Sequence, residues 1–216
     1  MGTLIVAGAP VADPRLLAPL VSSAHFVIAA DAGADLCLYL DRMPDLFVGD
    51  ADSVSASTLA RLRDANVESV IAPTDKEVSD LDIALSAAAE RGLEEVVVCA
   101  AWGSRADHTL ASVVSMLDAS SLRPVLVEPG EFTAWVLDAD ARSQILLAGS
   151  GRTFSVLPGP SGACVSISGA RWDLVDARLT PGSRHGLSNL GVADHVTVSI
   201  SEGSAFVILL EHDPSL

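Results

Sequence analysis

The first half of the chain alternates short apolar runs with stretches of helical spacing, and this alternation constrains the fold more than any other feature. The apolar runs are residues 3–9, 25–31, 45–50, 67–73, 94–101 and 123–129. Runs that are apolar on both faces are typical of strands buried between helix layers in a parallel sheet. Helical patterns at 55–65, 79–92 and 107–120 separate several of them. This order predicts an α/β domain with a mainly parallel sheet.

The pattern changes after about residue 131. Short β-rich pieces follow, separated by Gly, Pro and Ser: 132–140, 143–149, 153–158, 163–170, 195–201 and 204–211. Such spacing predicts an all-β sandwich. We therefore expect two domains, an α/β nucleotide-binding catalytic domain at 1–130 and a β-sandwich domain at 131–216. The connection 177–195 is long for a hairpin, which makes it a candidate functional loop.

Composition excludes several classes of protein. Half of the 216 residues are hydrophobic and the formal net charge is −15. A sizeable core is expected, and the charge argues against nucleic acid or an anionic membrane as partner. No run approaches the ~20 apolar residues of a membrane span, and no signal peptide is recognisable. Cys37, Cys99 and Cys164 lack zinc-ligand spacing, so we expect free thiols in a cytoplasmic protein.

Charged residues follow the predicted strands. Asp31 ends the second apolar run, and Asp50 and Asp52 come directly after the third, in PDLFVGDADSV. Asp80 stands at the start of the helical pattern 79–92, and the run 94–101 is followed by Arg105, Asp107 and His108. Ligands of parallel sheets bind beyond the carboxyl ends of the strands, so these residues are expected to converge on one edge.

The residue types at this edge favour a metal–phosphate site. Mg²⁺ prefers carboxylate and phosphate oxygens, and an Arg offers bidentate donors to phosphate. Asp50 and Asp52 have one residue between them, so in an extended stretch their side chains point the same way. Glycines would let backbone amides approach anionic oxygens; they are Gly33, Gly49 and Gly103.

Each of these residues also has a structural alternative. Asp31 at a helix start is a possible cap, an Asp-x-Asp pair can be simply solvated, and Arg105 with Asp107 can be an ordinary ion pair. For Asp80 a capping role is weaker, because Ser79 already offers a cap. What favours a site is that all these pieces follow strands on the same side of the sheet.

Motifs over nearly the whole chain resemble the thiamine pyrophosphokinase family. They are AADAGAD, PDLFVGDADSV, TDKEVSDLDIAL and AAWGSRADHTLASVVSML, followed by GARWDL, LSNL and GSAFVILLE. The resemblance implies an α/β domain joined to a β-sandwich, a homodimer, and an active site at the dimer interface. It implies transfer of the terminal pyrophosphate of ATP to the hydroxyl of thiamine, giving thiamine diphosphate and AMP, with Mg²⁺ as cofactor.

The resemblance also implies roles for single residues. Asp50, Asp52 and Asp80 would hold the metal and act in catalysis, with Asp80 or Asp52 accepting the hydroxyl proton. ATP would be bound by Asp31, Gly33, Arg105, Asp107 and His108. Thiamine would be bound by Trp172, Ser188 and Asn189, with the Trp172 ring stacked on the pyrimidine. Trp172 as a core residue is the structural alternative.

The chain departs from the family pattern at a few positions. Ala32 and Asp35 stand where the family usually has Gly and Asn, Glu77 and Ser79 replace Asp and Thr, and Ser104 replaces a glycine. These changes leave the acids in place. Two rival functions remain: a pyrophosphokinase for another heterocyclic alcohol, such as a hydroxymethylpterin, and a nucleotide-binding module without catalysis.

Overall fold

The chain forms two compact units, Met1–Ser115 and Met116–Leu216. The computed structural model describes residues 2–50, 52–71, 78–103 and 105–212. The division between the units falls inside helix α5 (Ala106–Asp118). The domain boundary at residues 130 and 131 stays a prediction. Glu77 and Ser104, which the sequence analysis singled out, lie outside the described residues.

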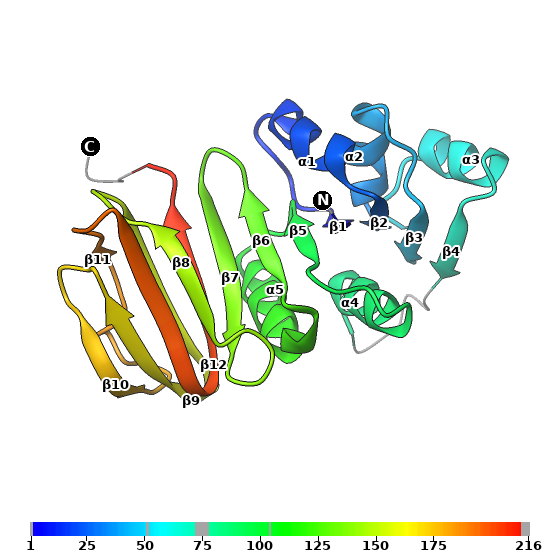
Figure 1. Ribbon diagram of the computed structural model, residues 1–216. Helices are drawn as coiled ribbons and strands as arrows, with labels where there is room; N and C mark the ends of the chain where they lie inside the picture. Colours follow the sequence, from blue (N-terminus) through cyan, green and yellow to red (C-terminus); the bar gives the residue numbers. More distant parts are fainter. Residues whose placement is uncertain (1, 51, 72–77, 104, 213–216) are drawn as a thin grey trace. The chain divides into compact units, whose positions relative to one another are not determined.

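Unit 1 is built on a parallel sheet (Figure 1). Its strands are β1 (Thr3–Val6), β2 (Phe26–Ala30), β3 (Leu46–Gly49), β4 (Glu68–Ile71) and β5 (Val97–Cys99). They run in the order β5-β1-β2-β3-β4, and each pair is parallel. The predicted α/β domain with a mainly parallel sheet is confirmed.

Helices cover this sheet on two sides. They are η1 (Pro14–Leu17), α1 (Ala18–Ser23), α2 (Gly33–Tyr39), α3 (Ala56–Asp64), α4 (Asp80–Glu90) and α5. One core cluster joins α1–α3 to alternate strand residues, among them Val6, Val27 and Phe47. The intervening residues, such as Ile28, are equally buried, and α4 lies on their side (Figure 1). Burial on both faces explains the unbroken apolar runs.

One strand differs from the prediction. The run 67–73 was expected to be buried on both faces, but all four residues of β4 are exposed, with Ile71 at 63%. The reason is its place at the edge of the sheet, where β3 is its neighbour. A local apolar pattern does not specify which strand becomes the edge.

Unit 2 is an antiparallel β structure. Its elements are η2 (Ser120–Leu122), β6 (Val125–Glu128), β7 (Phe132–Asp138), β8 (Gln144–Ala148), β9 (Thr153–Ser168), β10 (Leu174–Leu179), β11 (Asn189–Leu190) and β12 (His195–Leu210). The strands β9 and β12 pair with each other along most of their length. The two ends of β12 take different neighbours, β8 at residues 195–199 and β7 at residues 204–210.

The long strands β9 and β12 let the antiparallel sheet of unit 2 fold so that its two halves pack against each other. Register shifts interrupt the β9–β12 pairing between Ile200 and Ala205. Gly162 and Gly203 face each other there with φ of +80° and +73°, and a Cβ at Gly203 would lie 2.1 Å from the Gly162 carbonyl oxygen. One core cluster contains side chains from both halves, for example Phe154 with Ile167. This arrangement confirms the predicted all-β sandwich.

Candidate functional site

Unit 1 contains a cavity of about 690 Å³ at the carboxyl ends of β1, β2, β3 and β5, beside the first residues of α4 and α5. Six predicted site residues line it: Asp31, Asp50, Asp52, Asp80, Arg105 and His108. The parallel topology places these strand ends on one edge, so residues far apart in the sequence meet there. The predicted convergence is thus present in the structure.

Three of these side chains form a compact group, the acid cluster of Asp31, Asp50 and Asp52. Each offers a carboxylate oxygen, and the three oxygens lie within 4.8 Å of one another. Asp31 Oδ2 accepts a hydrogen bond from the Ser53 hydroxyl, and Asp50 Oδ1 accepts one of 3.1 Å from the Asp52 amide. Asp31 Oδ1 is buried and has no hydrogen-bond partner within the part of the chain that the structure describes.

The protonation of Asp31 reflects this crowding. Burial, together with the charges of Asp80, Asp50 and Asp52, raises the pKa of Asp31 above its ordinary value of 3.8, while the Ser53 hydroxyl acts to lower it. Desolvation and like charges both disfavour a carboxylate. Ionisation of Asp31 is therefore unfavourable without a ligand, as expected of a site that binds positive charge.

Asp80 is the first residue of α4, but it does not cap that helix. Ser79 is the cap: its Oγ accepts from Asp82 N at 3.1 Å, and Asp82 Oδ2 accepts from Ser79 N at 2.8 Å. A Cβ at Gly49, whose φ is +139°, would lie 3.2 Å from Asp80 Oδ1 and 3.3 Å from Asp31 Cβ. The glycine thus lets the two acids approach each other.

The acid cluster fits a hard divalent cation. All its donors are carboxylate oxygens, the ligands that Mg²⁺, Mn²⁺ and Ca²⁺ prefer over thiols and imidazoles. Buried polar atoms are rarely left without a partner, and Asp31, whose Oδ1 is such an atom among the described residues, has a carboxylate oxygen beside those of Asp50 and Asp52. A cation at this position would satisfy that oxygen and offset the repulsion among the three acids.

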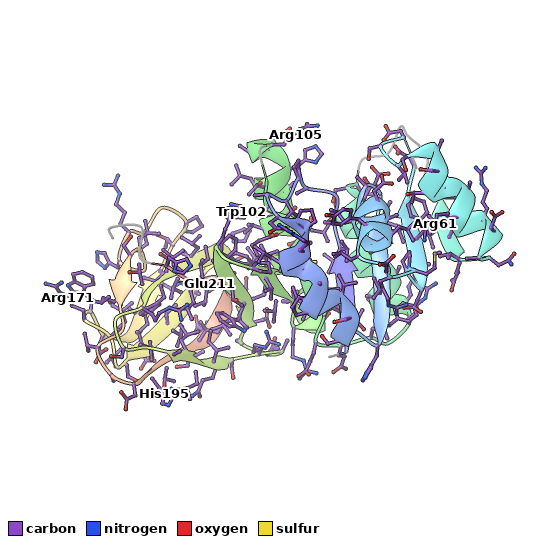
Figure 2. All side chains as sticks on the ribbon, turned by 90° about the horizontal axis from the view of Figure 1, so that it is seen from above. Arg61, Trp102, Arg105, Arg171, His195 and Glu211 are labelled. Atoms are coloured by element: carbon purple, nitrogen blue, oxygen red, sulfur yellow. The ribbon has the colours of Figure 1, made fainter. Side chains whose placement is uncertain are left out.

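The start of α5 contributes basic and polar groups to the cavity. Arg105 and His108 line it, while Asp107 is not among its lining residues. Arg105 Nη2 donates to Asp107 Oδ2 at 2.7 Å, and about two thirds of each side chain is exposed. Figure 2 shows Arg105 extending outward from this helix. The hydrogen bond from Arg105 lowers the pKa of Asp107 to about 2.

Gly33 has a packing role in the structure. It is buried at the start of α2, and a Cβ there would lie 2.0 Å from the Val6 carbonyl oxygen of β1. Gly33 is also absent from the residues that line the cavity. Its contacts explain why a glycine is needed, and its assignment to ATP stays a prediction.

The residues predicted to bind thiamine lie together in unit 2. The Trp172 side chain is 52% exposed, so it is not a core residue, and the Arg171 guanidinium lies 5.1 Å from its ring centroid. Asn189 is 1% exposed and bonds to the backbone of Trp172: Oδ1 accepts from Trp172 N at 3.1 Å, and Nδ2 donates to Trp172 O at 2.8 Å. Ser188 is exposed with φ of +52°, and its amide donates to Ser155 Oγ at 3.0 Å.

Two parts of the cavity were not predicted from the sequence. The segment Ala7–Pro10 after β1 lines it, although the sequence there is not a Walker loop. The signal was present, since the glycine and proline follow a strand that ends at the same edge. Ser53 also lines the cavity and bonds to Asp31. A serine in a loop carries no signal of such a contact.

Two family models match the chain. The model described as thiamin pyrophosphokinase, catalytic domain, matches residues 17–126, which is more than half of the chain. The model described as thiamin pyrophosphokinase, vitamin B1 binding domain, matches residues 142–204. The residues of the cavity from Asp31 to His108 lie within the first match, and Trp172, Ser188 and Asn189 lie within the second.

Solved structures share the fold. Thiamine pyrophosphokinase from Bacillus subtilis has 21% identity and a TM-score of 0.80, covering 99% of this chain and 100% of that chain. The enzyme from Geobacillus thermodenitrificans has 23% identity and a TM-score of 0.80, covering 100% of both chains. Yeast thiamin pyrophosphokinase has 14% identity and a TM-score of 0.74, covering 97% of this chain and 86% of that chain.

A search of curated protein sequences found no match. In the described part of the chain, every helix is too short or too polar to cross a membrane. The two family models together span both units of the structure, and the solved structures agree with them in fold. The chain therefore belongs to the thiamin pyrophosphokinase family.

Proposed function

We propose that this thiamine pyrophosphokinase uses ATP as donor and Mg²⁺ as cofactor, and that both bind in the cavity of unit 1. The observation that carries the proposal is the acid cluster at the carboxyl ends of parallel strands, with Asp80 and Arg105 on the same cavity. A triphosphate is itself anionic. A cation is therefore required between its phosphates and the four aspartates of the cavity, Asp31, Asp50, Asp52 and Asp80. An acidic protein can hold a nucleotide in this way.

Asp50, Asp52 and Asp80 would hold the metal, and the Asp31 carboxylate, which has an oxygen close to those of Asp50 and Asp52, would supply a further oxygen ligand. When bound, Mg²⁺ neutralises phosphate oxygens and the charge that develops on the leaving group. Arg105 and His108 would contact the phosphates from the start of α5. To do so, Arg105 would exchange the Asp107 carboxylate for a phosphate group, whose oxygens can accept from the guanidinium in the same bidentate way.

The reaction is a displacement at the β-phosphorus. The thiamine hydroxyl oxygen forms a bond to the β-phosphorus. The bond between this phosphorus and the oxygen that bridges the α- and β-phosphates breaks, and AMP leaves with the electron pair of that bond. Asp52 or Asp80 accepts the hydroxyl proton. Most of the catalysis in such a transfer is positioning and charge stabilisation rather than covalent chemistry.

Trp172 would supply the surface for thiamine. Its ring is half exposed, and an aromatic face can stack on a pyrimidine. Asn189 would act mainly by holding the Trp172 backbone, since its bonds go there. The homodimer with its site at the interface, the cytoplasmic location and the absence of nucleic-acid or membrane partners remain proposals of the sequence analysis.

The two rival functions are weaker. A pterin pyrophosphokinase would need a different pocket in unit 2, whereas that unit matches the vitamin B1 binding model. A non-catalytic module gains nothing from three mutually repelling carboxylates. Family membership favours the thiamine reaction over both.

The test is incubation of the purified protein with ATP, MgCl₂ and thiamine, followed by chromatography of the products. Equal amounts of thiamine diphosphate and AMP are expected, and none with EDTA. A hydroxymethylpterin in place of thiamine should give no AMP. Formation of ADP instead of AMP would contradict pyrophosphate transfer, and turnover of the pterin alone would favour the rival enzyme.

A further inference from the structure

We propose that Asp35 is a positioning residue for the acid cluster: its carboxylate fixes the chain segment that carries Asp50 and Asp52. Asp35 is on α2 and is not among the residues that line the cavity, so it would act through that segment rather than on the substrates. The inference rests on the metal role proposed above. The resemblance to the family implies no role for Asp35.

Asp35 binds the start of α3 through three hydrogen bonds. Its Oδ1 accepts from Ser55 Oγ at 2.6 Å and from Thr58 Oγ1 at 2.5 Å, and its Oδ2 accepts from Ser55 N at 3.1 Å. Ser55 is the cap of α3, since its Oγ accepts from Thr58 N at 3.2 Å. Thr58 is 5% exposed, so this network of Asp35, Ser55 and Thr58 is partly shielded from water.

The Asp35 network lies at the far end of the segment that bears the acids. Asp50 follows β3 at one end, Asp52 comes next, and Ser55 ends the segment at α3. Ser53 makes a parallel contact by donating to Asp31 Oδ2. Two carboxylates from the β2–α2 region thus hold two serines of the β3–α3 connection, and the acids that they position lie between β3 and these anchors.

The charge state of Asp35 suits this task. Burial acts to raise its pKa, but the hydrogen bonds from Ser55 and Thr58 outweigh burial and lower the pKa of Asp35. An ionised carboxylate accepts from all three donors at once, and bonds to a charged acceptor are stronger than neutral ones. An amide in the same place would turn its NH₂ group toward at least one of these donors.

A purely structural role is the competing explanation, because the same bonds also join α2 to α3. A second aspartate provides the matched control. Asp45 lies just before β3, at the amino end of that strand and so opposite the end that faces the cavity; its Oδ2 accepts from Val27 N at 2.8 Å and from Arg42 Nη2 at 2.7 Å. Like Asp35, it accepts hydrogen bonds from a backbone amide and from a side chain within unit 1, but it is not among the residues that line the cavity.

The experiment compares the full-length native protein with Asp35→Ala, Asp35→Asn, Asp45→Ala and Asp52→Asn. Mn²⁺ binding is measured from the electron paramagnetic resonance signal of free MnCl₂, without nucleotide. Loss of a group that orients metal ligands typically weakens binding about 10- to 100-fold, so Asp35→Ala should raise the Kd about tenfold. Asp35→Asn, which keeps one acceptor, should fall between Asp35→Ala and the native protein.

Asp35→Ala and Asp45→Ala should both lower the Tm. Asp45→Ala should leave the Kd for Mn²⁺ unchanged. Hydrogen exchange of the amides at 52–58 should speed up in Asp35→Ala but not in Asp45→Ala. Thr58→Val removes one donor at nearly constant volume and should give a smaller shift in the same direction; it serves as the readout if Asp35→Ala does not fold.

Three outcomes overturn the inference. Native Kd in both Asp35→Ala and Thr58→Val would leave Asp35 a structural residue. An equal rise of the Kd in Asp45→Ala would mean that the effect is general destabilisation. If Asp52→Asn binds Mn²⁺ as the native protein does, the proposed metal site is wrong and the inference about Asp35 falls with it. If Asp52→Asn binds Mn²⁺ more weakly while the Asp35 variants bind it normally, only the role of Asp35 is contradicted.

Discussion

The acid cluster in unit 1 and the Trp172 region in unit 2 handle their polar groups in opposite ways. In the acid cluster, a buried oxygen of Asp31 lacks a partner among the described residues, and three carboxylates repel one another. Around Trp172, the buried Asn189 is bonded on both sides of its amide, and the aromatic ring is left to solvent. The first region holds a buried oxygen without a hydrogen-bond partner among the described residues, whereas the buried amide of the second region is satisfied and its aromatic ring is half exposed. Substitutions should therefore affect catalysis in one region and substrate affinity in the other.

The largest effect is expected for Asp52→Asn. Loss of one carboxylate from the cluster should lower kcat by about 100-fold or more, because metal-based charge stabilisation contributes several kcal/mol. The protein should stay folded, because the amide of Asn has nearly the size of the carboxyl group it replaces. Steady-state kinetics with saturating substrates and thermal unfolding test both points, with the exposed Asp64→Asn on α3 as control. Near-native kcat in Asp52→Asn would show that the cluster is not catalytic.

Trp172→Ala should act on thiamine and spare the chemistry. Stacking of an aromatic side chain on a base contributes ~1–3 kcal/mol, so the KM for thiamine should rise about tenfold. The KM for ATP should stay within about twofold of the native value, because the acid cluster lies in the other unit. Trp172→Phe should keep most of the affinity. A rise in the KM for ATP of similar size would remove the contrast between the two regions.

Asn189→Ala should reproduce part of the Trp172 effect. It leaves the backbone groups of Trp172 and the amide of Leu190, which are partly buried, without their side-chain partner, which costs ~1 kcal/mol of stability. If Asn189 acts through Trp172, the double variant with Trp172→Ala should have the KM for thiamine of Trp172→Ala alone. Additive effects in this cycle would instead indicate direct contact between Asn189 and thiamine.

The smallest effect concerns the stability of the metal-free protein in EDTA. The pKa of Asp31 is raised in the folded state, so ionisation of this carboxyl disfavours folding. Asp31→Asn should raise the Tm at pH 7 by ~2 °C, and the gain should vanish as the pH falls through the folded pKa to below 3.8.

Asp107→Asn gives the matching test of opposite sign. The pKa of Asp107 is lowered to about 2, so its charge favours folding above pH 3.8 and that contribution is lost as the pH falls toward 2. At pH 7 the variant should be slightly less stable than the native protein, and the difference should be small because the pair with Arg105 is exposed. Equal shifts of Tm in both variants would contradict the contrast.

Much of unit 1 follows from the sequence because of its topology. Once the apolar runs are interpreted as parallel strands, Asp31, Asp50 and Asp52 must share an edge, and the structure has them there. Ser79 before Asp80 indicated correctly that the aspartate was not needed as a cap. These inferences succeed because chain direction in a parallel sheet, rather than side-chain packing, determines them.

The remaining features depend on contacts that leave no local pattern. Asp35 contacts Ser55 and Thr58, which lie 20 and 23 positions further along the chain, and no pattern around Asp35 indicates this contact. The resemblance assigned Asn189 to thiamine. The structure shows that Asn189 is buried and that its amide is hydrogen-bonded to the backbone of Trp172. The exposure of β4 depends on sheet order, which a single apolar run does not encode.

Gly49 affects how closely the aspartates of the cavity can approach one another. With a hydrogen in place of a methyl group, the backbone leaves room for Asp31 and Asp80 to approach from two different elements. The density of negative charge in the cavity is thus controlled by an uncharged position. To change the enzyme's preference toward a larger or more weakly hydrated ion, the first position to substitute would therefore be Gly49, before any carboxylate is exchanged.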